Sequence, residues 1–166
     1  SKKGDKRRMT DLKKMNGEAS RKDLNEMYNC YDALSKLKLS VYIKFDVGHN
    51  KNRLKENAEI INDIRTNNDD IDNFKDYQKG MQEISTKYIK KGKIESSDDA
   101  AAMNQEMVEF KKDFTDVTEA LEQKQKELDE KLKEVISYED IIQLKLKDFP
   151  KEIEVDLSPI VSFIER

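Results

Sequence analysis

The segment from Ser96 to Val135 reads SSDDAAAMNQEMVEFKKDFTDVTEALEQKQKELDEKLKEV and has the most regular apolar pattern in the chain. Its apolar residues recur at intervals of four and three, as in a coiled-coil heptad, with Lys124 and Lys131 at the remaining seam positions. We therefore predict a helical packing seam, used within the chain or by a partner helix. Its apolar members are Met103, Met107, Phe110, Phe114, Val117, Leu121, Leu128 and Val135.

A second helical stripe precedes this seam. From Leu54 to Tyr88 the apolar residues keep one helical phase across the polar stretch 67–70. Either one helix spans 47–90, or the polar stretch breaks it and Asp69 or Asp70 caps a second helix. Lys-Gly-Lys at 91–93 supplies a turn, so a long antiparallel hairpin joined near Gly92 is expected.

The regions flanking these stripes have weaker patterns. Ser20 is suited to cap a helix whose apolar positions run to Leu37. Residues 39–47 alternate as a half-buried strand does, although Val41 and Phe45 also fit helical spacing, and the local pattern favours a strand.

Beyond Val135, the alternation around 153–155 predicts an edge strand that pairs with 135–137 as a small ribbon. Ser158-Pro159 is typical of a helix start, because Pro is favoured at the first helical position. Together the patterns predict a mainly α fold: an elongated helical hairpin or coiled-coil-like bundle with a two-stranded β ribbon near the C-terminus. The expected divisions are a basic arm at 1–19, a helical bundle at 20–135 and a mixed segment at 136–166.

Composition excludes several classes of site. The chain has 166 residues, of which 40% are charged, with one His, one Cys and no Trp. A zinc site built from several Cys and His residues, or an internal disulfide, needs more of these residues than the chain contains. The longest apolar runs are too short for a membrane span or a secretory signal, so we expect no membrane partner.

Charge is distributed unevenly. Residues 1–22 contain nine basic and three acidic residues, a net charge of +6, whereas the remainder contains 23 basic and 32 acidic residues, a net charge of −9. Such a basic arm could bind an acidic protein neighbour, contact nucleic acid without sequence preference, or only solubilise the chain. The residues expected to contact a partner or nucleic acid are Lys2, Lys3, Lys6, Arg7, Arg8, Lys13 and Lys14.

No residue pattern indicates catalysis. His49 lies in a polar stretch and is expected at the surface or at a helix cap, and Cys30 is expected to be a small half-buried residue rather than a nucleophile. The acidic run 67–73 lacks the central Gly and the spacing of an EF-hand, and the glycines are too far apart for a phosphate-binding loop. We predict no enzyme activity, no metal site and no cofactor.

Several short motifs are similar in order and spacing to a family of small helical proteins of phages and prophages whose function is not assigned. The similarity extends from about Leu24 to the end of the chain. The motifs are Tyr31-Asp32-Ala33-Leu34, Leu39-Ser40-Val41, Ile84-Ser85-Thr86-Lys87-Tyr88, Phe110-Lys111-Lys112-Asp113-Phe114, Glu134-Val135-Ile136, Leu144 to Pro150, Ile153-Glu154-Val155, Leu157-Ser158-Pro159 and Phe163-Ile164-Glu165. The resemblance implies a phage origin, a helix across 41–47 and a binding role, and it supplies no catalytic residues.

These observations predict a non-enzymatic phage structural or assembly protein, a virion component that docks on other phage structural proteins or on itself. Docking would use the helical faces, and the basic arm would hold an acidic neighbour or contact nucleic acid. The alternative is a cytosolic phage regulator or host-takeover factor that binds a host protein. The expected location is the virion or the cytoplasm of the infected bacterial host.

Overall fold

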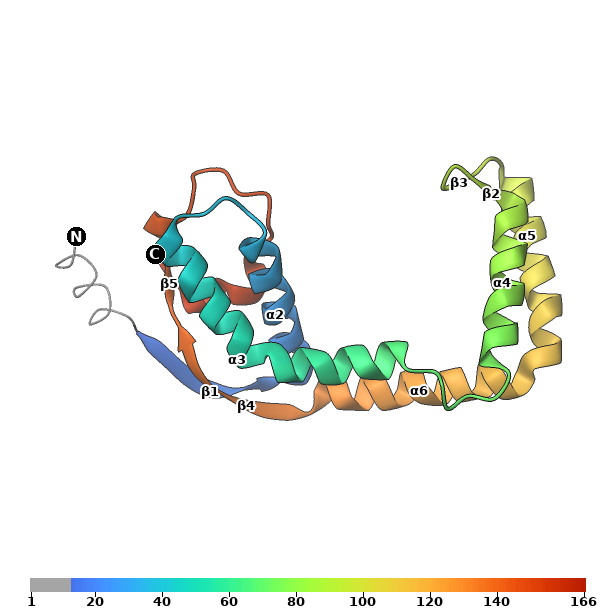
Figure 1. Ribbon diagram of the computed structural model, residues 1–166, viewed down its shortest axis with the longest axis horizontal. Coiled ribbons are helices and arrows are strands. Elements are labelled where there is room, and N and C mark those ends of the chain that lie inside the picture. The colour runs from blue at the N-terminus through green and yellow to red at the C-terminus, as the bar shows by residue number, and fades with distance from the viewer. Residues whose placement is uncertain (1–12) are drawn as a thin grey trace. The chain divides into compact units, whose positions relative to one another are not determined.

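A computed structural model describes residues 13–166 (Figure 1), and these residues form a mainly α protein, as the sequence predicted. The chain divides into two compact units. Unit 1 contains the described residues up to Asp63 together with Asp129–Arg166, and unit 2 is Ile64–Leu128. The helix α3 (Val41–Thr66) and the helix α6 (Thr115–Lys133) each pass from one unit to the other.

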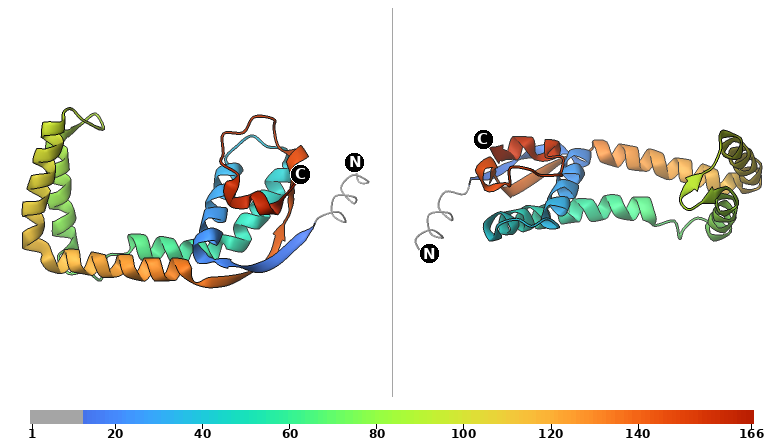
Figure 2. Two further views of the ribbon diagram at one scale, coloured as in Figure 1. Left: turned by 180° about the vertical axis from the view of Figure 1, so that it is seen from behind. Right: turned by 90° about the horizontal axis from the view of Figure 1, so that it is seen from above.

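Unit 1 is built on an antiparallel pair of strands, β1 (Lys14–Ser20) and β4 (Val135–Ile142), which lie side by side (Figure 2). One hydrophobic core joins these strands to α2 (Arg21–Ser35), to α3 and to the C-terminal segment. Its fully buried members include Tyr31 and Leu34 on α2 and Val47 on α3. The core therefore gathers elements from both ends of the chain.

Helix α2 begins where the sequence predicted. The Ser20 hydroxyl accepts a hydrogen bond from the backbone N–H of Asp23 at 3.1 Å, which satisfies one of the free donors of the first turn. The alternating residues 41–47 form the start of α3 and not a strand. Ile43 and Val47, four residues apart, face the core, whereas Val41 and Phe45 are exposed, so helical spacing decides this segment.

The ribbon predicted near the C-terminus is wrong in its pairing. Residues 153–155 form no strand, although Ile153 and Val155 pack on the core. β4 pairs instead with β1, with Ser20 opposite Val135 and Lys14 opposite Ile142. The last strand, β6 (Ile164–Glu165), pairs in parallel with β5 (Leu144–Lys145), and the short 3-10 helices η2 (Leu146–Asp148) and η3 (Ser158–Phe163) complete the tail.

Unit 2 contains the expected turn at Gly92. Helix α4 (Phe74–Tyr88) leads into β2 (Ile89–Lys90), and β3 (Lys93–Ile94) leads into α5 (Ser97–Lys111). Lys91 and Gly92 both have positive φ, at 53° and 74°, as a two-residue β-hairpin turn requires. The Ser96 hydroxyl caps α5 by accepting a hydrogen bond from the N–H of Asp99 at 3.1 Å.

The polar stretch 67–70 breaks the long helix. α3 ends at Thr66 and α4 starts after Asn73, whose φ is 65°, so neither Asp69 nor Asp70 is the cap. The Lys124 ammonium contacts the Asp70 carboxylate at 2.8 Å and also donates to the backbone oxygen of Asn67. Lys124, a predicted seam position, thus holds this loop against α6.

The predicted seam is not one continuous helix. A 3-10 turn, η1 (Lys112–Phe114), separates α5 from α6, and the two helices run in different directions (Figure 1). Around this turn Phe110 and Phe114 lie 4.8 Å apart between ring centroids, and Tyr77 of α4 lies 6.1 Å and 5.7 Å from them. This aromatic cluster joins α4 to α5 at the base of the hairpin.

Gly80 is needed at this cluster, because a Cβ added there would lie 2.1 Å from the Phe110 ring. We expect Gly80→Ala to destabilise unit 2 by about 1 to 3 kcal/mol, since overpacking forces the ring or the helix to move. The measurement is hydrogen exchange of the α4 and α5 amides. Gly48→Ala is the matched control, because a Cβ at Gly48 of α3 meets nothing, and it should be neutral or stabilise by up to about 1 kcal/mol. Equal protection factors in the Gly80 variant and the original chain would contradict this packing.

Candidate functional site

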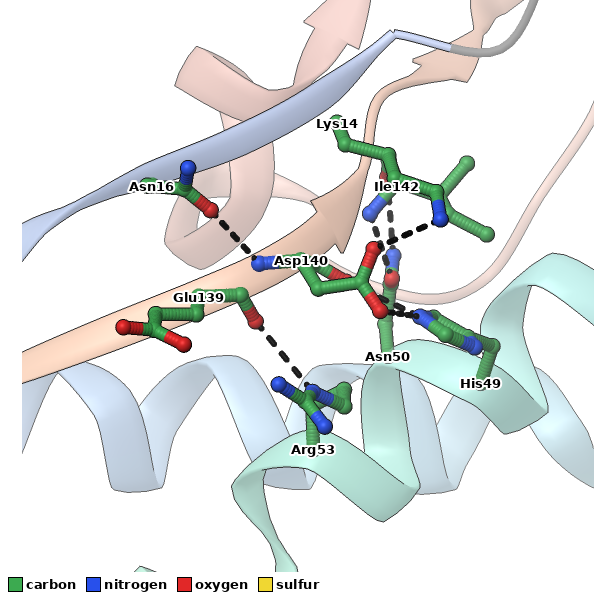
Figure 3. Close-up of polar contacts among 8 residues, drawn as sticks. All are labelled: Lys14, Asn16, His49, Asn50, Arg53, Glu139, Asp140 and Ile142. Atoms are coloured by element: carbon green, nitrogen blue, oxygen red, sulfur yellow. Dashed lines mark hydrogen bonds and ion pairs between the residues drawn. The ribbon is translucent and has the colours of Figure 1, made fainter.

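The edge of β4 that faces α3 is bound by side chains of that helix (Figure 3). Asn50 is fully buried, and its amide nitrogen donates to the carbonyl of Ile142 at 2.9 Å while its amide oxygen accepts from the Ile142 N–H at 2.7 Å. The side chain thereby takes both hydrogen bonds that a residue of a third strand would take. This is possible because an amide side chain has the same donor and acceptor as a peptide group.

Asp140 forms the polar centre beside this contact. The strands are out of register between Met15 and Gly17, and Asp140 there has a φ of 59°, with its N–H donating to the Asn16 side chain at 2.8 Å. Its carboxylate lies 3.1 Å from the Lys14 ammonium and 3.2 Å from Nε2 of His49 (Figure 3). The Lys14 ammonium lowers the pKa of Asp140, with smaller contributions from His49 and Arg53.

His49 is not a free surface group. It is half-buried, and its Nε2 lies 2.9 Å from the carbonyl oxygen of Asp140. Arg53, one turn further along α3, donates from Nε to the carbonyl of Glu139 at 3.3 Å. Both side chains therefore hold β4 to α3, which the position of His49 in a polar stretch did not predict.

Arg21 has a structural role that the charge pattern did not predict, because in the sequence it is one of nine basic residues in 1–22. It is only 8% exposed and donates to the Asn57 side chain at 2.9 Å and to the Glu134 carboxylate at 3.0 Å. Arg21 and Lys131 lower the pKa of Glu134. Arg21 thus ties the start of α2 to α3 and to the residue before β4.

Cys30 is more buried than expected, at 5% exposure, and its Sγ lies 3.4 Å from the carbonyl of Asp156. Burial raises the pKa of the thiol to about 11, with a smaller contribution from Asp156. The thiol is therefore protonated at neutral pH and is a weak nucleophile.

The seam residues differ in burial. Val117 and Leu128 are buried, whereas Val135 is 66% exposed at the start of β4. The other five, Met103, Met107, Phe110, Phe114 and Leu121, are half-buried.

The predicted arm lies largely outside the described residues, which exclude Lys2, Lys3, Lys6, Arg7 and Arg8. Lys13 and Lys14 are described, and both are tied to the sheet. The carbonyl of Lys13 accepts from the N–H of Gln143 at 2.8 Å, and Lys14 pairs with Asp140. Residues 14–19 of the expected arm belong to the strand β1.

Among residues 13–166, the most exposed large apolar side chains lie at the start of α3. Val41 is 80% exposed and Phe45 is 74% exposed, and their spacing of four residues places them on one face of the helix. Tyr42, beside them, is 46% exposed. We call Val41 and Phe45 the α3 face.

A search of residues 13–166 finds no helix long and apolar enough to span a membrane. Over the same residues, no three His, Cys, Asp or Glu side chains are grouped so that they could hold a metal ion.

Replacing Asn50 tests the link between α3 and β4. Asn50→Ala leaves the N–H and C=O of Ile142 without these partners, so we expect a loss of about 2 to 4 kcal/mol in the free energy of unfolding. Urea denaturation measures the loss. Asn52→Ala, at an exposed position of the same helix, should stay within about 0.5 kcal/mol. Similar losses in the two variants would show that the Ile142 contact contributes little.

The ion pair of Asp140 predicts a pH dependence. Because its folded pKa is lowered, the Asp140 carboxylate stabilises the fold at neutral pH, and this contribution is lost as the pH falls through the ordinary range of Asp, about 4, and then through the folded pKa. Asp140→Asn keeps a side chain that tolerates positive φ. Its melting temperature should lie below that of the original chain at pH 7, and the gap should close near pH 2. A gap that is unchanged at low pH would exclude the ion pair as its cause.

Comparisons with protein-family models, with curated proteins and with solved structures find no match to this chain.

Proposed function

We propose that this chain is a non-enzymatic structural or assembly protein of a phage, which docks on other structural proteins of the particle. The α3 face carries this proposal. A Phe and a Val that are 74% and 80% exposed at helical spacing form an apolar surface that water solvates poorly. Such a surface is suited to an apolar helix face of a partner.

The hairpin of α4 and α5 supports the same role. Its two helices are joined by the aromatic cluster at the base and by Glu106, which accepts from the Tyr88 hydroxyl at 2.8 Å and from the Lys87 ammonium at 2.5 Å. In this proposal the hairpin is an elongated helical spacer or docking arm. The basic segment 1–12, outside the described residues, would hold an acidic neighbour or packaged nucleic acid.

The phage assignment itself rests on the sequence resemblance. Under this proposal the chain is located in the virion, or in the cytoplasm of the infected host while particles assemble. Quantitative mass spectrometry of purified particles tests it. A chain that is abundant in infected cells and absent from particles would exclude the virion role and favour a regulator that binds a host protein.

A substitution on the α3 face should separate docking from folding. We expect Phe45→Asp to reduce incorporation into particles at least tenfold while the melting temperature changes little, since Phe45 contributes to no core. Val161→Asp is the matched control, because Val161 is 48% exposed on η3 and belongs to no proposed docking surface. Normal incorporation of the Phe45 variant, measured by the same mass spectrometry, would exclude the α3 face as the docking surface.

A further inference from the structure

The sheet of β1 and β4 contains these two strands alone within residues 13–166, so β4 has one edge without a strand partner. Along Glu139–Ile142, side chains of α3 bind this edge. Asn50 binds both backbone groups of Ile142, His49 binds the carbonyl of Asp140, and Arg53 binds the carbonyl of Glu139 (Figure 3). α3 therefore occupies this end of the edge, and a further strand could be added only towards the start of β4.

Towards the start of β4 the space beside α3 opens into a groove of about 390 Å³. This volume is within the range of known ligand sites, roughly 300 to 1,000 Å³. β4 lines one side from Ile136 to Glu139, and α3 lines the other side from Arg53 to Ile60. Arg21 and Leu24 of α2 complete the lining. The groove thus combines a strand backbone, apolar side chains and guanidinium groups.

The side chains indicate the chemistry of an occupant. Leu54, Ile60 and Ile136 provide apolar surface, and Ile60 is 36% exposed. Arg53 is exposed, and its Nε donates to the carbonyl of Glu139.

Arg21 adds a buried donor beside this surface. Its Nε has no hydrogen-bond partner within residues 13–166, although its terminal nitrogens are bound to Asn57 and Glu134. Glu56 and Glu139 also line the groove and balance the two guanidinium groups, so the groove does not favour a run of acidic residues.

We propose that this groove binds an extended segment of a partner protein, which adds as a further strand on the α3-facing edge of β4. The segment carries apolar side chains at alternate positions and one carboxylate that pairs with Arg53. Unpaired strand edges accept chains in this way because main-chain hydrogen bonds supply affinity and side-chain pockets supply selectivity. The inference rests on the proposed function, since it names the partner chemistry of a docking protein.

The test uses the full chain and a library of fluorescein-labelled eight-residue peptides, with apolar and polar residues alternating and Glu or Asp at a central position. Fluorescence anisotropy measures binding. At least one peptide should bind, and methylation of its edge-facing amide nitrogens should weaken it about tenfold or more. Arg53→Gln should weaken the acidic peptide by a similar factor and should not weaken its Gln analogue.

Ile60→Glu should block the groove without unfolding the chain, because Ile60 is 36% exposed. Val161→Glu is its control, as Val161 is 48% exposed in unit 1 and does not line the groove. Circular dichroism verifies that both variants are folded. Failure of every peptide to bind, or binding that survives both amide methylation and Arg53→Gln, would overturn the proposal.

Sedimentation of the chain alone tests whether a second copy of the chain occupies the groove. A dimer that Ile60→Glu dissociates would replace the partner segment by a second copy and would overturn the proposal in its present form. Mass spectrometry of purified particles tests the virion role separately from the groove. Peptide binding in the groove with no chain in particles would remove the virion role alone, and the reverse result would remove the groove alone.

Discussion

The edge contact between Asn50 and Ile142 is the constraint on which unit 1 depends. An isolated two-stranded ribbon is marginally stable in water and exposes two rows of backbone groups. Here the ribbon survives because one buried amide completes the hydrogen bonds of Ile142, which is 3% exposed, while the core covers the rest of that end. The contact joins residues 92 positions apart, so it also closes the long excursion of the chain through unit 2.

The local elements were predictable because their signals are local. Ser20 and Ser96 cap the helices expected at those points, and Gly92 supplies the turn of the hairpin. The pattern at 41–47 left strand and helix open, because the local alternation favoured a strand whereas the spacing of Val41 and Phe45, and the family resemblance, fitted the helix that forms. Only the tertiary structure shows that Ile43 and Val47 face the core together.

The pairing of β1 with β4 was not predictable from the sequence pattern. Residues 14–20 read KMNGEAS, with no β-branched or aromatic residue to indicate a strand, and their partner lies more than 110 positions away. The candidate site depends on this pairing, because it places β4 against α3. The basic charge of the first 22 residues also did not show which of them pair within the chain. Lys14 and Arg21 bind carboxylates of unit 1.

Two asparagines on α3 bind different partners beside β4. Asn50 and Asn57 lie two helical turns apart on the same face of α3 and carry the same amide group. Asn50 binds the backbone of Ile142, whereas Asn57 accepts from the Arg21 guanidinium and donates to the Arg21 carbonyl at 3.2 Å. Arg21 therefore occupies both the donor and the acceptor of the Asn57 amide, and both residues line the groove at the start of β4. The same amide group thus binds a strand edge at one position of α3 and an arginine at another.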